Sequence, residues 1–123
     1  MSFYSFMINR AFSSSDNRRD RGLTTPDDIL RFDNISYGTE LLDVYRPKAG
    51  ERFPVIVSVH GGGWVYGDKD RYQYYCMDLA RRGFSVVNFT YRLAPKHKFP
   101  AALEDTCSAF SWEIGRASCR ERV

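Results

Sequence analysis

The sequence predicts an α/β protein built on a single sheet, and three observations support this fold class. The chain has 123 residues and is 43% hydrophobic, which is enough for one globular domain and too little for two. Short β-branched segments alternate with segments of helical spacing in its second half, an order that is typical of a parallel sheet. A hairpin pattern comes before them. We therefore expect an antiparallel hairpin, then parallel strands with flanking helices.

The N-terminal region, residues 1–31, reads as a helix and a linker. Apolar residues recur near helical spacing over 3–11, and the polar stretch 13–17 indicates a flexible connection. Thr25, followed by proline and then by an acidic residue, resembles an N-cap, which predicts a short helix that ends near Phe32. We expect the N-terminal helix to form a small cap over a site elsewhere in the chain.

The remaining elements follow from short apolar runs and from helix-terminal signals. The expected strands are residues 34–37, 40–45, 53–59 and 84–90, the first two forming the hairpin. One expected helix spans residues 68–82, with acidic residues at its start and arginines and a glycine at its end. A second helix begins at Pro100 and carries Leu103, Cys107 and Phe110 on one side. This alternation of strand and helix predicts parallel strand pairing.

Three successive glycines, Gly61, Gly62 and Gly63, directly follow an expected buried strand. Because glycine has no Cβ, their backbone N–H groups can turn outward together and approach a ligand closely. Such a turn suits an oxyanion, as in acyl transfer. A phosphate cradle is the rival interpretation, but the stretch matches neither GxxxxGK[ST] nor GxGxxG. A structural turn without function is the third, and an isolated triple glycine favours it.

The glycines belong to a larger set of motifs. HGGGW at residues 60–64 is followed by YRLAP at 91–95 and by FPAALED at 99–105, and LDVYRP at 42–47 precedes them. In content, order and spacing this set resembles the α/β-hydrolase superfamily, specifically the esterase and lipase branch related to hormone-sensitive lipase. The resemblance covers residues 35–112. It implies the N-terminal part of an α/β-hydrolase sheet and a carboxylesterase that works through an acyl-enzyme.

The resemblance also implies roles for individual residues. Gly62 and Gly63 would donate backbone N–H groups to the oxyanion, Gly61 would permit the turn, and Trp64 would pack beside the acyl pocket of the substrate. His60 is expected to shape the glycine loop, since the family's base lies after the serine and the acid. Pairing of Arg92 with the acidic residues 104 and 105 is expected to tie the following loop to its helix. His97 is expected to be solvated or to anchor a loop.

Catalysis in this family needs a serine on a Gly-x-Ser-x-Gly elbow, then an acid and a histidine, and the sequence contains no such elbow. We therefore expect no catalytic residue in this chain, and we expect residues 32–112 to be the N-terminal part of a longer hydrolase domain. Residues 113–123 resemble read-through of a sequencing adapter, which predicts a non-native tail. An incomplete sheet would leave the strand 53–59 open at one edge, so we expect aggregation and no activity in isolation.

Composition narrows the partners. The net charge is +3 without a dense basic run, which argues against nucleic acid, and the longest aliphatic stretch, 55–57, is far shorter than the roughly 20 residues that span a membrane. The three cysteines lack the spacing of a metal site, so we expect no metal, and we expect no cofactor. No secretory signal sequence is visible, which favours the cytoplasm. The expected partner is a small acyl ester. Alternatives are an amide or formamide, an acetylated or feruloylated sugar, a non-catalytic receptor on the same scaffold, or a self-sufficient binding domain.

Overall fold

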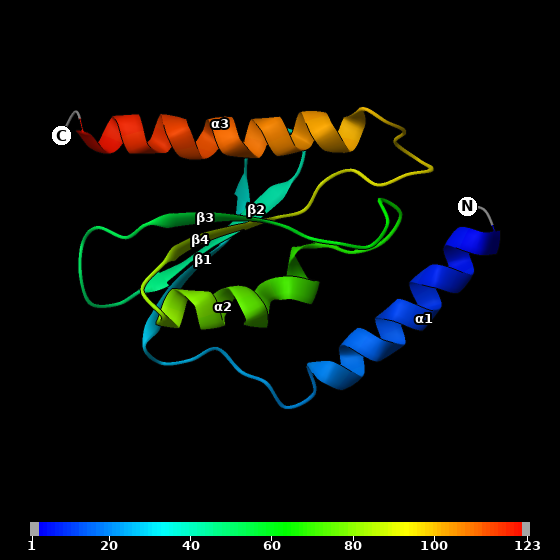
Figure 1. Ribbon diagram of the computed structural model, residues 1–123, viewed down its shortest axis with the longest axis horizontal. Helices are drawn as coiled ribbons and strands as arrows, with labels where there is room; N and C mark the ends of the chain where they lie inside the picture. The colour runs from blue at the N-terminus through cyan, green and yellow to red at the C-terminus, as the bar shows by residue number, and fades with distance from the viewer. Residues whose placement is uncertain (1–2, 122–123) are drawn as a thin grey trace.

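The structure, a computed structural model, describes the backbone of residues 3–121 and the side chains of residues 3–116. In chain order its elements are α1 (Phe3–Arg19), β1 (Ile29–Ser36), β2 (Leu41–Pro47), β3 (Val55–Val59), the 3-10 helix η1 (Lys69–Tyr72), α2 (Gln73–Arg81), β4 (Ser85–Phe89) and α3 (Ala101–Glu121) (Figure 1). α3 continues past residue 112 without a break, and the last residues of the expected tail, 122–123, lie outside the described range.

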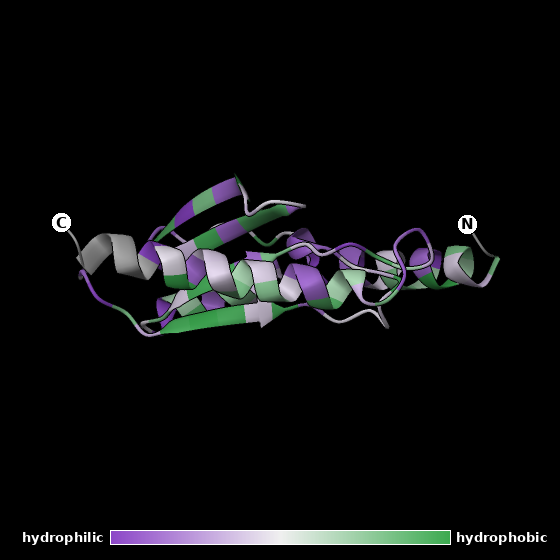
Figure 2. Cartoon of the chain, turned by 90° about the horizontal axis from the view of Figure 1, so that it is seen from above, coloured by the Kyte–Doolittle hydropathy of each residue, from purple (hydrophilic) through white to green (hydrophobic). Residues whose placement is uncertain are grey.

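The four strands form one sheet in the order β1-β2-β4-β3. β1 pairs with β2 and β2 pairs with β4, both antiparallel, whereas β3 and β4 are parallel, with Val57 opposite Val87. This arrangement confirms the expected hairpin followed by parallel strands. β3 lies at the edge, the strongly hydrophobic strand along one side of the sheet in Figure 2. Val55 and Val59 are 45% and 44% exposed, because β3 has a paired neighbour on one side only.

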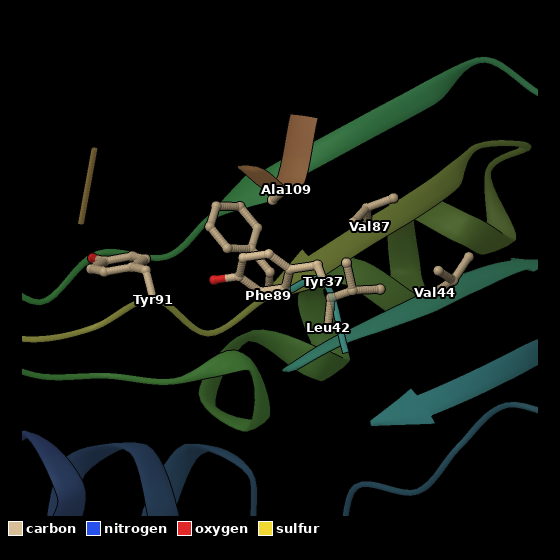
Figure 3. Packing of buried hydrophobic residues seen from close by; sticks show 7 residues of the cluster. All are labelled: Tyr37, Leu42, Val44, Val87, Phe89, Tyr91 and Ala109. Atoms are coloured by element: carbon tan, nitrogen blue, oxygen red, sulfur yellow. The ribbon is translucent and has the colours of Figure 1, made fainter. Parts of the chain in front are cut away.

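α3 covers one face of the sheet and α2 the other (Figure 1). Successive strand residues point to opposite faces, so each face has its own core. Seven buried residues form the core on the α3 face (Figure 3): Tyr37, Leu42, Val44, Val87, Phe89, Tyr91 and Ala109. Six form the core on the α2 face: Ile29, Tyr45, Cys76, Met77, Ala80 and Val86. The loop that follows β3 therefore starts from a sheet that is packed on both faces.

Two expectations about the N-terminal region are wrong. The short helix expected between Thr25 and Phe32 is absent, and β1 begins at Ile29 instead, because pairing with β2 satisfies its backbone and buries Ile29 against the α2 face. The linker expected over 13–17 is helical, and α1 continues to Arg19. Side chains of that stretch contact the loop after β3 and η1, so tertiary contacts override its low helix propensity.

The expected helix over 68–82 is confirmed with one refinement. Its first turn is the 3-10 helix η1, and the Asp68 side chain caps it by accepting a hydrogen bond from Arg71 N–H at 3.1 Å. α2 then continues the element to Arg81. The spacing of Tyr72, Cys76 and Ala80 places these residues on the sheet side, as the amphipathic pattern predicts.

α3 packs on the sheet through its small residues. Its buried side chains recur every fourth residue and are Ala101, Asp105 and Ala109. The larger apolar residues Leu103, Cys107 and Phe110 do share one side, as expected, but that side is exposed. A helix that carries apolar residues on two sides has two candidate packing faces, and the spacing alone does not decide which one meets the sheet. No helix within residues 3–121 is long and apolar enough to cross a membrane.

Candidate functional site

The triple glycine forms a tight turn at the carboxyl end of β3. Gly62, Gly63 and Trp64 all have positive φ, at 128°, 62° and 66°, and the Gly62 carbonyl oxygen accepts hydrogen bonds from Val65 N–H at 3.2 Å and Tyr66 N–H at 3.1 Å. A Cβ on Gly62 would lie 1.9 Å from the Tyr66 carbonyl oxygen. Only glycine fits that position, because any side chain would overlap the returning backbone.

The N–H groups of this turn have no internal acceptor. Within residues 3–121, no group accepts a hydrogen bond from the backbone N–H of Gly61, Gly62 or Gly63. Gly62 is half-buried and Gly61 and Gly63 are exposed, so water or a ligand can supply the acceptor for these N–H groups. The turn can therefore bind an oxyanion or another small acceptor.

His60 is held immediately before the turn. Its side chain is buried, at 3% exposure, and Nδ1 donates a hydrogen bond to the Gly61 carbonyl oxygen at 2.8 Å. The imidazole stacks on the Tyr91 ring with centroids 4.0 Å apart, and the Tyr91 hydroxyl donates to the His60 carbonyl oxygen at 2.7 Å. Burial lowers the pKa of His60, so the ring is neutral at pH 7. The residue is locked by its neighbours on both its ring and its backbone.

Trp64 stands at the outer end of the turn and lines one cavity. Its side chain is 58% exposed, and its carbonyl oxygen accepts a hydrogen bond from Ala94 N–H at 2.9 Å. On one side it lines an apolar cavity of about 290 Å³ together with Phe99, Ala102 and Leu103. The second cavity, of about 670 Å³, lies next to the neighbouring Val65. The two cavities share Arg92, Ala94 and His97 of the loop that follows β4.

The second cavity is walled by the loop that follows β4 and by the N-terminal half of α1. Tyr91 and Leu93 come from the loop, and Ser5 and Asn9 come from the helix. His97 is half-buried and lines both cavities, so the structure places it between them. Its backbone N–H donates to the Leu93 carbonyl oxygen at 2.9 Å within the same loop.

An ion pair fixes the loop that follows β4. Asp105 on α3 is fully buried and accepts hydrogen bonds from the Arg92 backbone N–H at 2.8 Å, from the Arg92 guanidinium at 2.8 Å and from the Thr39 hydroxyl at 2.7 Å. Burial by itself raises the pKa of Asp105, but these hydrogen bonds outweigh it and hold the pKa below its ordinary value. The expected pairing of Arg92 with Asp105 and Glu104 is present.

α1 contacts the glycine loop directly. The Tyr66 hydroxyl donates to Asp16 at 2.6 Å, and the Phe12 and Tyr66 rings stack with centroids 5.5 Å apart. Arg71 donates to the Asn17 side chain at 2.7 Å. The N-terminal helix therefore lies against the segment that leaves the turn.

Sequence reasoning missed a polar cluster on the α2 face. Asp43 on β2 and Asn88 on β4 are direct cross-strand partners, and both contact Lys69 on η1. The available signal was that each of two apolar strands carries one polar residue, Asp43 or Asn88, at a position that faces the core. That signal shows that a buried polar partner must exist, but it does not say which residue supplies it.

Comparisons with known proteins place these features in one family. The family model named BD-FAE matches residues 42–119, more than half of the chain. The carboxylic ester hydrolase LipN of Mycobacterium tuberculosis is 44% identical over 75 residues, which are 60% of this chain and 20% of that protein. The chain thus spans about a fifth of the length of that curated relative.

Solved structures match the fold as well. The hyperthermophilic esterase from the archaeon Pyrobaculum calidifontis superposes with a TM-score of 0.74 at 35% identity, over 91% of this chain and 36% of that one. EstE1, a thermostable carboxylesterase cloned from a metagenomic library, superposes with a TM-score of 0.77 at 30% identity, over 95% of this chain and 42% of its own. Both neighbours share the fold of this chain.

Proposed function

Because the chain belongs to the BD-FAE family, within the esterase and lipase branch of the α/β hydrolases, we propose that it is the N-terminal part of a serine carboxylic-ester hydrolase. In this proposal the chain supplies the oxyanion loop, and the nucleophile, acid and base come from sequence beyond it. The coverage of its relatives, at 20% and 42% of their lengths, supports a longer enzyme.

The observation that carries the proposal is the turn with unpaired donors at the end of β3. When a serine oxygen bonds to the carbonyl carbon of an ester, the π electrons of the C=O bond move to the carbonyl oxygen, and this oxygen becomes negative. We assign the N–H groups of Gly62 and Gly63 to that oxygen, and Gly61 permits the turn that presents them. Donors already in place lower the barrier by about 3 to 4 kcal/mol, because no solvent has to reorganise as the charge develops.

Residues beyond this chain then carry out the release of the alcohol. The tetrahedral intermediate collapses, the carbon–oxygen bond to the alcohol breaks, and the base returns the serine proton to the alkoxide. Water then adds to the acyl-enzyme and releases the acid. The neutral, locked His60 shapes the turn in this scheme, because its Nδ1–H is donated to the Gly61 carbonyl oxygen and burial lowers the pKa of its ring.

The apolar cavity of about 290 Å³ that Trp64 lines, and the cavity of about 670 Å³ next to Val65, support a small or medium acyl ester as the substrate, with Trp64 as a pocket wall. An amide, a formamide or an acylated sugar uses the same oxyanion geometry and stays an alternative substrate class. A non-catalytic receptor on this scaffold is the alternative of a different kind. The cytoplasm stays the expected compartment.

The first test is the complete reading frame of the gene, resequenced across the Trp112 codon. An esterase requires a Gly-x-Ser-x-Gly elbow downstream, followed by an acid and a histidine. A substituted triad supports the receptor, and a natural frame that ends at Val123 overturns hydrolysis and the adapter origin of residues 113–123 together.

The second test uses the recovered enzyme. A phosphonate ester probe forms a covalent bond between its phosphorus and the nucleophilic serine, and its phosphoryl oxygen takes the place of the oxyanion. We expect a crystal structure of the adduct to place that oxygen within about 3 Å of the Gly62 and Gly63 nitrogens. An oxygen directed away from both nitrogens refutes the assignment.

A further inference from the structure

A buried ion pair lies on the α2 face of the sheet, beneath the segment that leaves the glycine turn. Lys69 is 7% exposed and Asp43 is 1% exposed, and Lys69 Nζ lies 3.1 Å from Asp43 Oδ1 and 3.2 Å from Oδ2. The carboxylate also accepts hydrogen bonds from Asn34 N–H and from the Tyr45 hydroxyl, each at 2.9 Å. Both oxygens of Asp43 are therefore fully used.

The backbone of Lys69 is bound as firmly as its side chain. Its N–H donates to the Thr90 hydroxyl at 3.1 Å, and its carbonyl oxygen accepts from Asn88 Nδ2 at 2.6 Å. Asp43 and Asn88 face each other across β2 and β4, so three groups of one residue are attached to adjacent strands. Burial alone lowers the pKa of the ammonium, but its hydrogen bonds to carboxylates raise it above the ordinary value and keep it charged. The exposed Asp70 is its second carboxylate neighbour, at 3.2 Å.

This attachment reaches the glycine turn through Gly67. A Cβ on Gly67 would lie 2.7 Å from His60 Nδ1 and 2.8 Å from the Gly61 carbonyl oxygen, so the outgoing segment packs directly on the residues that begin the turn. Gly67 is only two residues from Lys69. A displacement of Lys69 therefore displaces the segment that supports His60 and Gly61.

We propose that Lys69 is a positioning residue, and that its ion pair with Asp43 holds residues 67–69 against the sheet so that the N–H groups of Gly62 and Gly63 keep their direction. The role in catalysis rests on the proposed function, whereas the role in holding the turn does not. Formation of η1 needs no buried lysine, because a solvent-facing lysine fits the same helix. The burial of Lys69 therefore needs another reason.

Stability alone is a weak reason. Replacing both members of a buried ion pair by neutral residues of similar shape is often harmless to folding, whereas removing one member leaves an uncompensated charge. K69M/D43N is the matched neutral pair, because asparagine keeps an acceptor for Asn34 N–H or the Tyr45 hydroxyl. We expect this double variant to fold and to lose the alignment of the turn.

The experiment compares K69M/D43N with a control, R81M/D28N, which removes an exposed ion pair far from the turn. Both are made in the protein encoded by the complete reading frame. The readout is the pair of backbone amide NMR signals of Gly62 and Gly63, with urea unfolding to confirm the fold. We expect both glycine signals to shift and broaden in K69M/D43N and to stay unchanged in the control.

Unchanged glycine signals in a folded K69M/D43N variant overturn the proposal, as do equal shifts in the control. If the double variant does not fold, K69R, which keeps the charge and moves its head group, is measured in the same way, and unchanged signals again overturn the proposal. In an active enzyme we further expect kcat to fall about 10- to 100-fold with KM unchanged. The glycine signals need no nucleophile, so a failure here is distinguishable from a failure of the proposed function.

Discussion

Substitution of Gly62 by alanine is the sharpest perturbation of the turn. The new Cβ would lie 1.9 Å from the Tyr66 carbonyl oxygen and 2.6 Å from its carbonyl carbon, and both atoms belong to the backbone. Neither can move like the end of a flexible side chain. The turn must therefore open, whereas Gly63→Ala meets no atom within 4 Å and only has to accept a φ of 62°.

The geometry defines how much the two substitutions differ in their effect on the free energy of unfolding. Alanine at a positive φ costs about 1–2 kcal/mol, and Gly63→Ala carries only that cost. Gly62→Ala adds the loss of hydrogen bonds from Val65 and Tyr66 to the Gly62 carbonyl oxygen, at about 0.5–1.5 kcal/mol each. We expect Gly62→Ala to lower the free energy of unfolding by about 2–5 kcal/mol, at least about 1 kcal/mol more than Gly63→Ala does.

Urea unfolding followed by tryptophan fluorescence measures both changes, because Trp64 lies at the end of the turn. In the active enzyme kcat is the second readout, and we expect Gly62→Ala to lower it by about 10² to 10³, the usual effect of losing one oxyanion donor. Equal destabilisation by the two alanines would refute the assigned backbone overlap. Undiminished kcat in Gly62→Ala would refute the role of this N–H.

Three further results are expected. Tyr91→Phe leaves the His60 carbonyl oxygen without its 2.7 Å donor and lowers the free energy of unfolding by about 1–3 kcal/mol, measured in urea. Burial lowers the pKa of His60 in the folded chain, so the stabilisation that this neutral ring provides is present above its unfolded pKa of about 6.5 and is lost on acidification. Between pH 7.5 and 5 the wild type should therefore lose more free energy of unfolding than His60→Asn does. Equal losses in the two proteins contradict this. Tyr66→Phe removes the 2.6 Å bond to Asp16, so amide hydrogen exchange in α1 should accelerate, while the exposed Tyr75→Phe leaves it unchanged.

The N-terminal region shows where local sequence is a poor guide. A Thr-Pro pair followed by acids fits a helix start, yet Ile29 belongs to a strand because β2 offers it both a hydrogen-bonding edge and an apolar face. The polar stretch 13–17 is helical because its side chains find partners in Tyr66 on the loop after β3 and in Arg71 on η1. The first outcome depends on a neighbouring strand that the local pattern does not contain, and the second depends on residues 50 or more positions away.

The sequence by itself determined the α/β class, the hairpin, the two parallel strands and the glycine turn, because hydrophobic period, helix-end signals and glycine spacing are local properties of the chain. Only the tertiary structure decided which face of α3 packs on the sheet, that Tyr91 locks His60, and that Lys69 is buried on Asp43. These contacts join residues that are distant in sequence, and their energy depends on burial, which exists only once the sheet and its helices have come together.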